Sequence, residues 1–243
     1  MFPRFLAVEF LKLRRSLALL LCAAAPACIA VLGALIALDR GGDWRGFALG
    51  NSAFWAFAML PMALTALSVL LAQMEHGARA WDHLLALPGA RLHLFLAKAV
   101  VMLTLLWGMT LWLFVLLHLS GLAVDAITPG TFKGTPDPVG TASVLVRMAL
   151  ASTLVAILQL WVALRFRSFV PPLVFGIAGT FAAIVAVSAR QGVYFPWLMA
   201  TNILAADPAK SALALTLGGL GGLLALGAML VHLGRRDMVG AGS

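Results

Sequence analysis

Six long stretches of the chain contain no Asp, Glu, Lys or Arg, and they constrain the fold more than any other feature. They are residues 16–38, 46–74, 99–124, 148–164, 168–189 and 211–234. An apolar segment of roughly 20 residues can cross the hydrocarbon core of a bilayer as a helix. The fourth stretch is shorter, but a helix over 142–164 is long enough if Arg147 lies near an interface. The pattern predicts an all-α membrane protein with six transmembrane helices.

These stretches also define the expected domain organisation. A single transmembrane domain covers 16–234, preceded by an interfacial helix over 1–15 and followed by a cytoplasmic tail over 235–243. The predicted spans are about 16–38, 48–72, 97–120, 142–164, 169–189 and 210–233.

The composition supports a membrane protein and argues against a soluble one. Hydrophobic residues make up 63% of the chain and charged residues 11%, with a mean hydropathy of +1.02. Soluble domains carry about 25% charged residues. A net charge of +8 in a soluble chain would suggest a nucleic-acid partner. Here we interpret it as loop charge that sets topology, and we expect no nucleic-acid partner.

The distribution of Lys and Arg predicts the orientation. If the N-terminus is cytoplasmic, the inner segments hold eleven of the 17 basic residues and the outer segments hold six. The inner residues are Arg4, Lys12, Arg14, Arg15, Arg79, Arg91, Lys98, Arg165, Arg167, Arg235 and Arg236. The outer residues are Arg40, Arg45, Lys133, Arg147, Arg190 and Lys210. This excess of positive charge favours a cytoplasmic location for both termini.

The first 15 residues have the periodicity of an amphipathic helix. Its apolar face contains Phe2, Phe5, Leu6, Phe10 and Leu13, and its basic residues are Arg4, Lys12, Arg14 and Arg15. Glu9 lies within the apolar arc and can pair with Lys12 at i,i+3. Such a helix is suited to the inner membrane interface, where it would contact lipid. The alternative is a plain positively charged anchor.

The longest inner segment, residues 73–98, contains an apolar ridge beside charged residues. Trp81, Leu84, Leu85 and Pro88 recur at helical spacing, and Pro88-Gly89 would end the helix. A ridge centred on tryptophan is suited to docking in a groove of a partner protein. The alternative is a helix that lies on the lipid surface.

Small residues at four-residue spacing mark the last stretch. Ala214, Gly218 and Gly222 form a stripe that lets another helix approach closely, either within this chain or in a second subunit.

His118 and Arg147 are ionisable residues near the outer ends of two spans. Both positions are shallow enough for the side chain to reach the interface, so their role stays open.

Sequence motifs of enzymes are absent. The chain contains no GxxxxGK[ST] phosphate loop, no GxGxxG after a strand, no HExxH and no CxxC. No carboxylate lies in the middle of a span, which argues against proton relay. We therefore predict no catalytic residue, no metal site and no directly bound cofactor, so any energy source must be a partner.

Three segments of the chain resemble a known protein family. The opening VEFLKLRRSLALLLCAAAP is similar to the start of permease subunits of bacterial ABC-2 type transporters, in which an interfacial helix leads into the first span. The run from Glu75 through Trp81 to Leu87-Pro88, then Arg91 and Lys98, resembles the inner loop of that family. The apolar segment around Pro196 and Trp197 resembles its outer re-entrant helices. The small size resembles permeases for lantibiotic or other peptide immunity.

The resemblance implies a partner that hydrolyses ATP. The chain would be a permease in the bacterial inner membrane, dimerising with a second copy or a divergent permease and binding separate ATP-binding subunits that hold ATP and Mg²⁺. The inner loop would act as a coupling helix on the ATPase, with Glu75, Arg79, Trp81, Asp82, Leu84 and Leu85 as contact residues. The expected activity is export of a hydrophobic or amphipathic substrate. The alternative function is a membrane scaffold or assembly factor that transports nothing.

Overall fold

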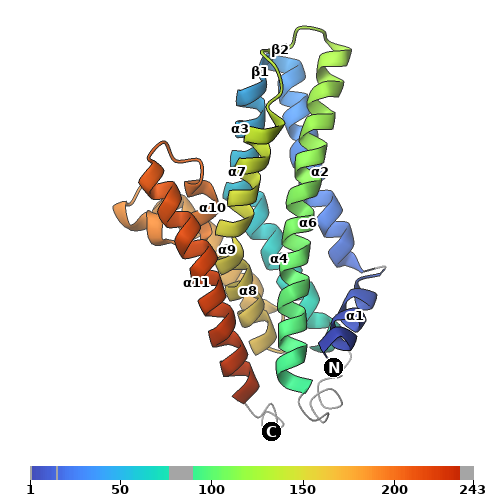
Figure 1. Ribbon diagram of the computed structural model, residues 1–243, viewed down its shortest axis with the longest axis vertical. Coiled ribbons are helices and arrows are strands. Elements are labelled where there is room, and N and C mark those ends of the chain that lie inside the picture. The colour runs from blue at the N-terminus through green and yellow to red at the C-terminus, as the bar shows by residue number, and fades with distance from the viewer. Residues whose placement is uncertain (1, 15, 77–89, 236–243) are drawn as a thin grey trace.

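The computed structural model describes residues 2–14, 16–76 and 90–235. The chain forms a tall helical bundle with one minimal strand pair at the end far from the N-terminus (Figure 1). We call this the outer end and the opposite one the inner end, after the orientation that the charge pattern predicts. The elements are α1 (Phe2–Leu13), α2 (Leu17–Arg40), β1 (Gly42–Asp43), α3 (Trp44–Phe54), the π-helical turn η1 (Trp55–Met59), α4 (Leu60–His76), α6 (Ala90–Ile127), β2 (Phe132–Lys133), α7 (Pro138–Ala151), α8 (Thr153–Arg165), α9 (Val170–Ala186), the 3₁₀ turns η2 (Arg190–Tyr194) and η3 (Pro196–Leu198), α10 (Met199–Asn202) and α11 (Pro208–Arg235).

The described part of the chain contains five helical segments long and apolar enough to cross a membrane. They are Leu17–Arg40, Trp44–Met74, Leu92–Ile127, Pro138–Arg165 and Pro208–Arg235. The sixth expected span, 169–189, corresponds to α9, an apolar helix of 17 residues. At 1.5 Å per residue α9 is about 25 Å long, less than the roughly 30 Å of a hydrocarbon core. An all-α membrane fold is confirmed, whereas the count of six spans stays a prediction.

The second span changes helical geometry ahead of a proline. Proline has no backbone N–H, and its ring crowds the carbonyl of the preceding turn. The chain accommodates Pro61 by a π-helical turn, η1, directly before it. The wider π turn re-spaces the backbone at that point. In α2, by contrast, the helix is continuous from Leu17 to Arg40 with Pro26 inside it.

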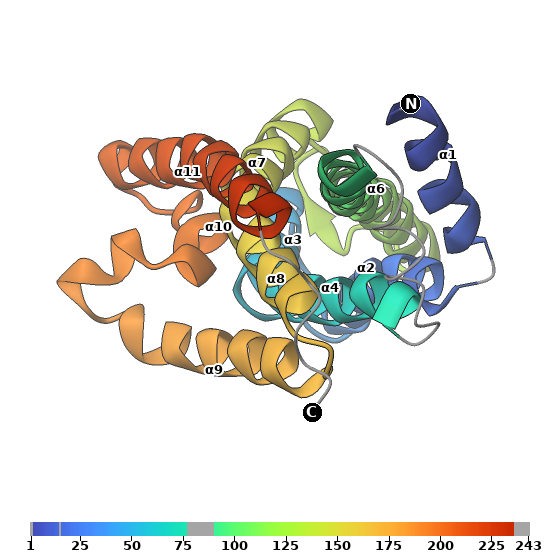
Figure 2. The ribbon, with the colours of Figure 1, turned by 90° about the horizontal axis from the view of Figure 1, so that it is seen from below.

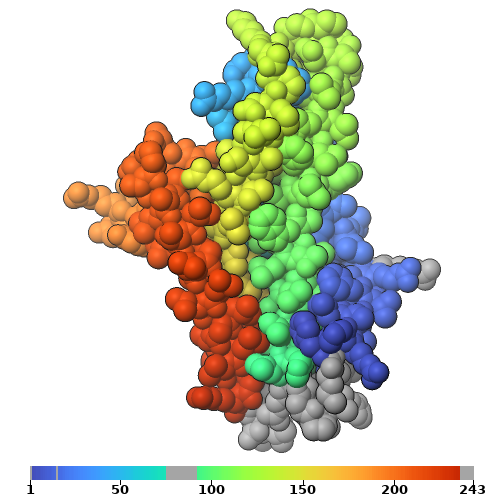
Figure 3. Space-filling view, in the orientation of Figure 1, coloured from blue at the N-terminus to red at the C-terminus, as the bar shows by residue number. Residues whose placement is uncertain are grey.

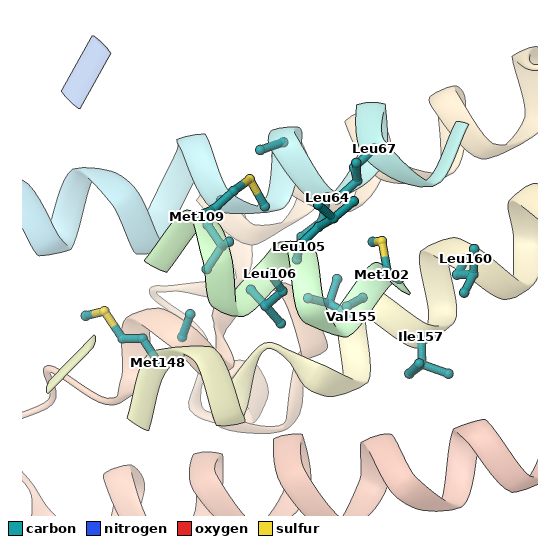
Figure 4. Packing of buried hydrophobic residues seen from close by; sticks show 14 of the residues in the cluster. Leu64, Leu67, Met102, Leu105, Leu106, Met109, Met148, Val155, Ile157 and Leu160 are labelled. Atoms are coloured by element: carbon teal, nitrogen blue, oxygen red, sulfur yellow. The ribbon is translucent and has the colours of Figure 1, made fainter. Parts of the chain in front are cut away.

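The core lies between α4, α6 and α8. Leucine and methionine side chains from these helices form one cluster, in which Leu64 on α4 lies beside Leu105 on α6 and Leu106 points to the other side of α6 (Figure 4). Leu64, Leu67, Met102 and Leu106 are fully buried. Because lipid tails are as apolar as leucine, close packing rather than water exclusion holds such helices together. The core therefore fixes how α4 and α6 lie relative to each other.

A small aromatic cluster closes the outer end. Trp44 packs on Phe132 with ring centroids 4.8 Å apart, and Phe47 lies 5.1 Å from the same ring. β1 and β2 pair in parallel beside this cluster. Gly41, with φ of 63°, ends α2 in a conformation that favours glycine. This strand pair links the α2–α3 turn to the segment after α6, and the hydrophobic pattern did not predict it.

The segment before α11 is folded into short turns. It comprises η2, η3 and α10, in the apolar segment around Pro196 and Trp197 whose sequence resembles re-entrant helices. Trp197 in η3 is 5% exposed and lies against Gly179 of α9, where a Cβ would come within 2.3 Å of its ring. α9 extends to one side of the bundle and packs against α4 and α8 as well as against this tryptophan (Figure 2).

Candidate functional site

The candidate site lies at the inner end of the bundle, where α4 ends at His76 and α6 begins at Ala90. Glu75 belongs to the last turn of α4 by its backbone. The other predicted contact residues, Arg79, Trp81, Asp82, Leu84 and Leu85, fall outside the described residues. The structure therefore shows the frame that holds this segment: the end of α4, the start of α6 and the helix α1 beside them.

Helix α1 turns its aromatic face to the protein. Phe5, Leu6 and Phe10 pack against the core, and Leu13 is buried. The Phe5 ring stacks on His93 of α6, with centroids 6.2 Å apart and an angle of 10° between planes. Figure 3 shows α1, in dark blue, covering the lower end of α6, in green. The apolar arc predicted for the membrane interface thus packs on the bundle, and the opposite face of α1 is exposed.

That other face carries both apolar and basic residues. Val8 is 48% exposed and Leu11 59% exposed. Arg4 and Arg14 are also exposed, towards the two ends of the helix. Arg15 lies outside the described residues. An apolar strip with basic ends is suited to the lipid headgroup region.

Glu9 projects from the packed face of α1 into a buried charge cluster. Its Oε1 atom lies 2.6 Å from Lys12 Nζ, the i,i+3 pair that the sequence predicted. Its Oε2 atom lies 2.9 Å from Lys98 Nζ on α6. Glu9 is 2% exposed and Lys98 is fully buried, whereas Lys12 is 30% exposed. The amphipathic helix is therefore fastened to α6 by an ion pair shielded from solvent.

The sequence did not identify Lys98 as a partner of Glu9, although it contained one signal. A carboxylate within the apolar arc of an amphipathic helix must find a partner when that arc is buried. Glu9 was such a carboxylate, but 89 positions separate it from Lys98. Only the packing of α1 on α6 brings the two residues together.

The surroundings of Glu9 shift its acidity. Burial raises the pKa of its carboxyl group, but the attraction of Lys98 and the hydrogen bonds from Lys12 and Lys98 outweigh burial and hold the pKa below the ordinary 4.5. Because the folded-state pKa is lowered, ionised Glu9 stabilises the fold above about pH 4.5, and this contribution is lost as the pH falls through the lowered pKa.

The lowered pKa of Glu9 predicts how the stability of the protein changes at acidic pH. Between pH 5 and pH 3 the melting temperature of the wild type should fall more steeply than that of Glu9→Gln, which cannot titrate at this position. The measurement is thermal unfolding of the purified protein followed at several pH values. Other carboxylates titrate equally in both proteins, so the difference in slope isolates Glu9. Parallel curves would show that the ion pair adds no pH-dependent stability.

The small-residue stripe of α11 lies against α8 and the end of α7. Ala214 is fully buried. A Cβ on Gly218 would come within 2.1 Å of the Ala151 carbonyl oxygen, and one on Gly222 within 2.7 Å of Thr153 Cγ2. These three residues therefore serve close helix packing inside the chain.

The two outer ionisable residues have local hydrogen bonds. His118 Nδ1 lies 2.8 Å from the Phe114 carbonyl oxygen, one turn earlier on α6. Arg147 Nη2 donates to Ser211 Oγ at 2.7 Å, which joins α7 to the first turn of α11. Ser211 Oγ in turn lies 3.3 Å from the Ile203 carbonyl oxygen. Arg147 thus ties the outer end of α11 to the bundle.

A polar cluster lies within the bundle between α4, α8 and α9. Gln159 Nε2 donates to Thr65 Oγ1 at 2.9 Å, and Thr65 Oγ1 donates to the Pro61 carbonyl oxygen at 2.9 Å. A Cβ on Gly176 would come within 2.0 Å of Thr65 Oγ1. The hydrogen bond from Gln159 joins α8 to α4, and Gly176 lets α9 approach this pair closely.

A cavity of about 310 Å³ lies near the outer end, between α2 and α3. Its walls are mostly glycine and aromatic, including Gly33, Gly50, Phe47 and Phe54, with Asn51 as a polar wall residue. Asp43 also lines the cavity, and its side chain accepts a hydrogen bond from the Gly46 N–H in the first turn of α3. Within the described ranges, no cluster of three or more His, Cys, Asp or Glu residues could hold a metal.

Comparison with known proteins identifies the family of this chain. No curated protein matches the chain. A family model described as "ABC-2 family transporter protein" matches residues 5–183, which includes α1, the ion pair, and both helices that flank residues 77–89. The match confirms the resemblance seen in the sequence. The chain belongs to the ABC-2 family of transporter proteins and is a multi-pass membrane permease of an ABC transporter.

Proposed function

We propose that the chain is the permease subunit of a bacterial inner-membrane exporter driven by a separate ATP-binding subunit. The observation that carries this proposal is the family match over residues 5–183 of a chain whose sequence lacks a phosphate loop. A transporter of this family needs ATP hydrolysis, so a second chain must supply it. The predicted substrate is hydrophobic or amphipathic, and the apolar outer cavity and the apolar spans support that class.

The arrangement of helices suggests how energy would reach the membrane. Closure of an ATPase dimer on ATP would displace the segment between α4 and α6. Both helices are part of the core, to which they contribute Leu64, Leu67, Met102 and Leu106. A displacement of the segment between them would therefore be transmitted to helices of the core. We propose that Glu75, Arg79, Trp81, Asp82, Leu84 and Leu85 contact the ATPase, and that two permeases, identical or divergent, share the complex.

Disruption of the apolar ridge tests this function. Replacing Trp81 and Leu84 together with aspartate should reduce the recovery of the ATP-binding subunit by at least ~10-fold, because buried apolar anchors dominate interface energies. The measurement is affinity purification of the tagged permease in mild detergent, with identification of co-purifying chains. Mass analysis of the same sample distinguishes a homodimer from a heterodimer.

The matched control keeps the ridge apolar. Trp81→Phe with Leu84→Ile should recover the ATP-binding subunit at the wild-type level. Normal recovery with the two aspartates would remove these residues from the contact. A wild-type permease that brings down no ATPase would overturn the transport function and favour the scaffold.

A further inference from the structure

Three helices meet at one buried lysine. Lys98 Nζ on α6 lies 2.9 Å from Glu9 Oε2 on α1 and 3.2 Å from the carbonyl oxygen of Leu71 on α4. Lys98 is 0% exposed and Glu9 2% exposed. A charged donor in such surroundings makes strong hydrogen bonds, and it is costly to leave unpaired. The contacts therefore hold α1, α4 and α6 in a fixed register.

The junction lies close to both helix ends that flank residues 77–89. Lys98 lies about two turns after the start of α6, and Leu71 lies in the last two turns of α4. These are the two helices that flank residues 77–89. Lys98 thus links α1 to both ends of the segment that we propose to contact the ATPase. The neighbouring ion pair joins Glu9 and Lys12, which both belong to α1.

Helix α1 is also joined closely to α2. The Ser16 N–H donates to the Leu13 carbonyl oxygen at 3.0 Å, and the Arg14 N–H donates to the Leu11 carbonyl oxygen at 3.1 Å. Only three residues separate the end of α1 from the start of α2. A displacement of α1 would therefore be passed to α2, whose outer end lines the cavity beside α3.

We propose that Lys98 is a positioning residue that joins α1 to the two helices flanking residues 77–89, so that all three move as one unit with α2. On this view α1 is a working part of the permease and not a passive membrane anchor. The existence of the junction is inferred from the contacts of Lys98 and does not depend on the proposed function. Its use in transmitting the movement of an ATPase rests on the proposed function.

An apolar replacement separates a junction of three helices from a simple α1–α6 contact. Lys98→Met combined with Glu9→Leu removes both charges and keeps apolar contact between α1 and α6. It cannot replace the hydrogen bond to the Leu71 carbonyl oxygen on α4. If Lys98 only fastens α1 to α6, this double variant should restore the wild-type hydrogen-exchange protection of both α1 and the end of α4. If Lys98 is a junction of three helices, the protection of α1 should return and that of α4 should not.

Hydrogen exchange on the full-length permease in lipid nanodiscs tests the junction without any partner. Lys98→Met should speed exchange in α1 by at least ~10-fold and in the last two turns of α4 by about threefold, since both lose a partner. In the double variant, exchange in α1 should return to within about twofold of wild type, while the end of α4 stays fast. The control Lys12→Met should change neither region by more than about twofold. Unchanged exchange at the end of α4 in Lys98→Met, or full restoration by the double variant, would overturn the junction.

A second arm tests transmission. In the complex with its ATP-binding subunit, the double variant should retain the ATPase at the wild-type ratio but lose most of the permease-dependent stimulation of ATP hydrolysis. Wild-type stimulation in the double variant would overturn transmission through Lys98. If the wild type binds no ATPase, the proposed function fails, and the exchange experiment still decides the junction.

Discussion

Replacing Lys98 with methionine is expected to lower the free energy of unfolding of the permease by about 3–5 kcal/mol, because it leaves a buried carboxylate without its main partner. Glu9 is 2% exposed, so water cannot take the place of the ammonium group. Lys12 lies 2.6 Å away on the other side of the carboxylate and offsets only part of the loss. The measurement is thermal unfolding in detergent, in which the melting temperature should fall by roughly 10 °C or more.

Two variants show whether the pairing, and not the bulk of the lysine, is responsible. Lys12→Met removes a partner that is 30% exposed, and its effect should stay within about 1 kcal/mol. Glu9→Leu with Lys98→Met should recover stability to within about 1 kcal/mol of wild type, since an apolar pair of similar volume often replaces a buried ion pair. A double variant as unstable as Lys98→Met would mean that the destabilisation comes from lost volume.

The membrane spans could be predicted from the sequence because hydrophobic length is a local property. The uncharged runs around α2, α6 and α11 are each visible without knowledge of any neighbour. For α9 the uncharged run, 168–189, is longer than the helix, which is Val170–Ala186 and ends before η2. Its burial depends on Trp197 and Gln159, which arrive from other parts of the chain.

The candidate site was predictable only in part, for the same reason. The pair between Glu9 and Lys12 follows from helical spacing and is present in the structure. The partnership with Lys98 depends on which face of α1 packs on α6, and hydrophobic periodicity cannot distinguish a face turned to lipid from one turned to protein. In a membrane protein both environments are apolar, so the usual contrast between core and solvent is lost.

The glycines of α11 are a case in which a local pattern did identify a packing face. Gly218 and Gly219 are neighbours in the sequence, and the four-residue spacing of Ala214, Gly218 and Gly222 selects only Gly218. In the structure a Cβ on Gly218 would lie 2.1 Å from the Ala151 carbonyl oxygen, 2.5 Å from Ala151 Cα and 2.6 Å from its carbonyl carbon. A Cβ on Gly219 would meet nothing within 4 Å. The two positions therefore predict opposite outcomes for one substitution.

Gly218→Ala should destabilise the permease by about 3 kcal/mol, because the obstructing atoms belong to the backbone and cannot rotate away, so α11 must separate from α7 and α8. Gly219→Ala should leave stability unchanged or raise it by up to about 1 kcal/mol, since alanine favours the helix and nothing obstructs its methyl group. Thermal unfolding of the two purified variants in the same detergent measures the difference. Because Gly222 also lies against α8, a gap opened at Gly218 spreads along the contact, and the two variants should differ by about 10 °C in melting temperature. Equal melting temperatures would show that α11 does not lie this close to the end of α7 at Gly218.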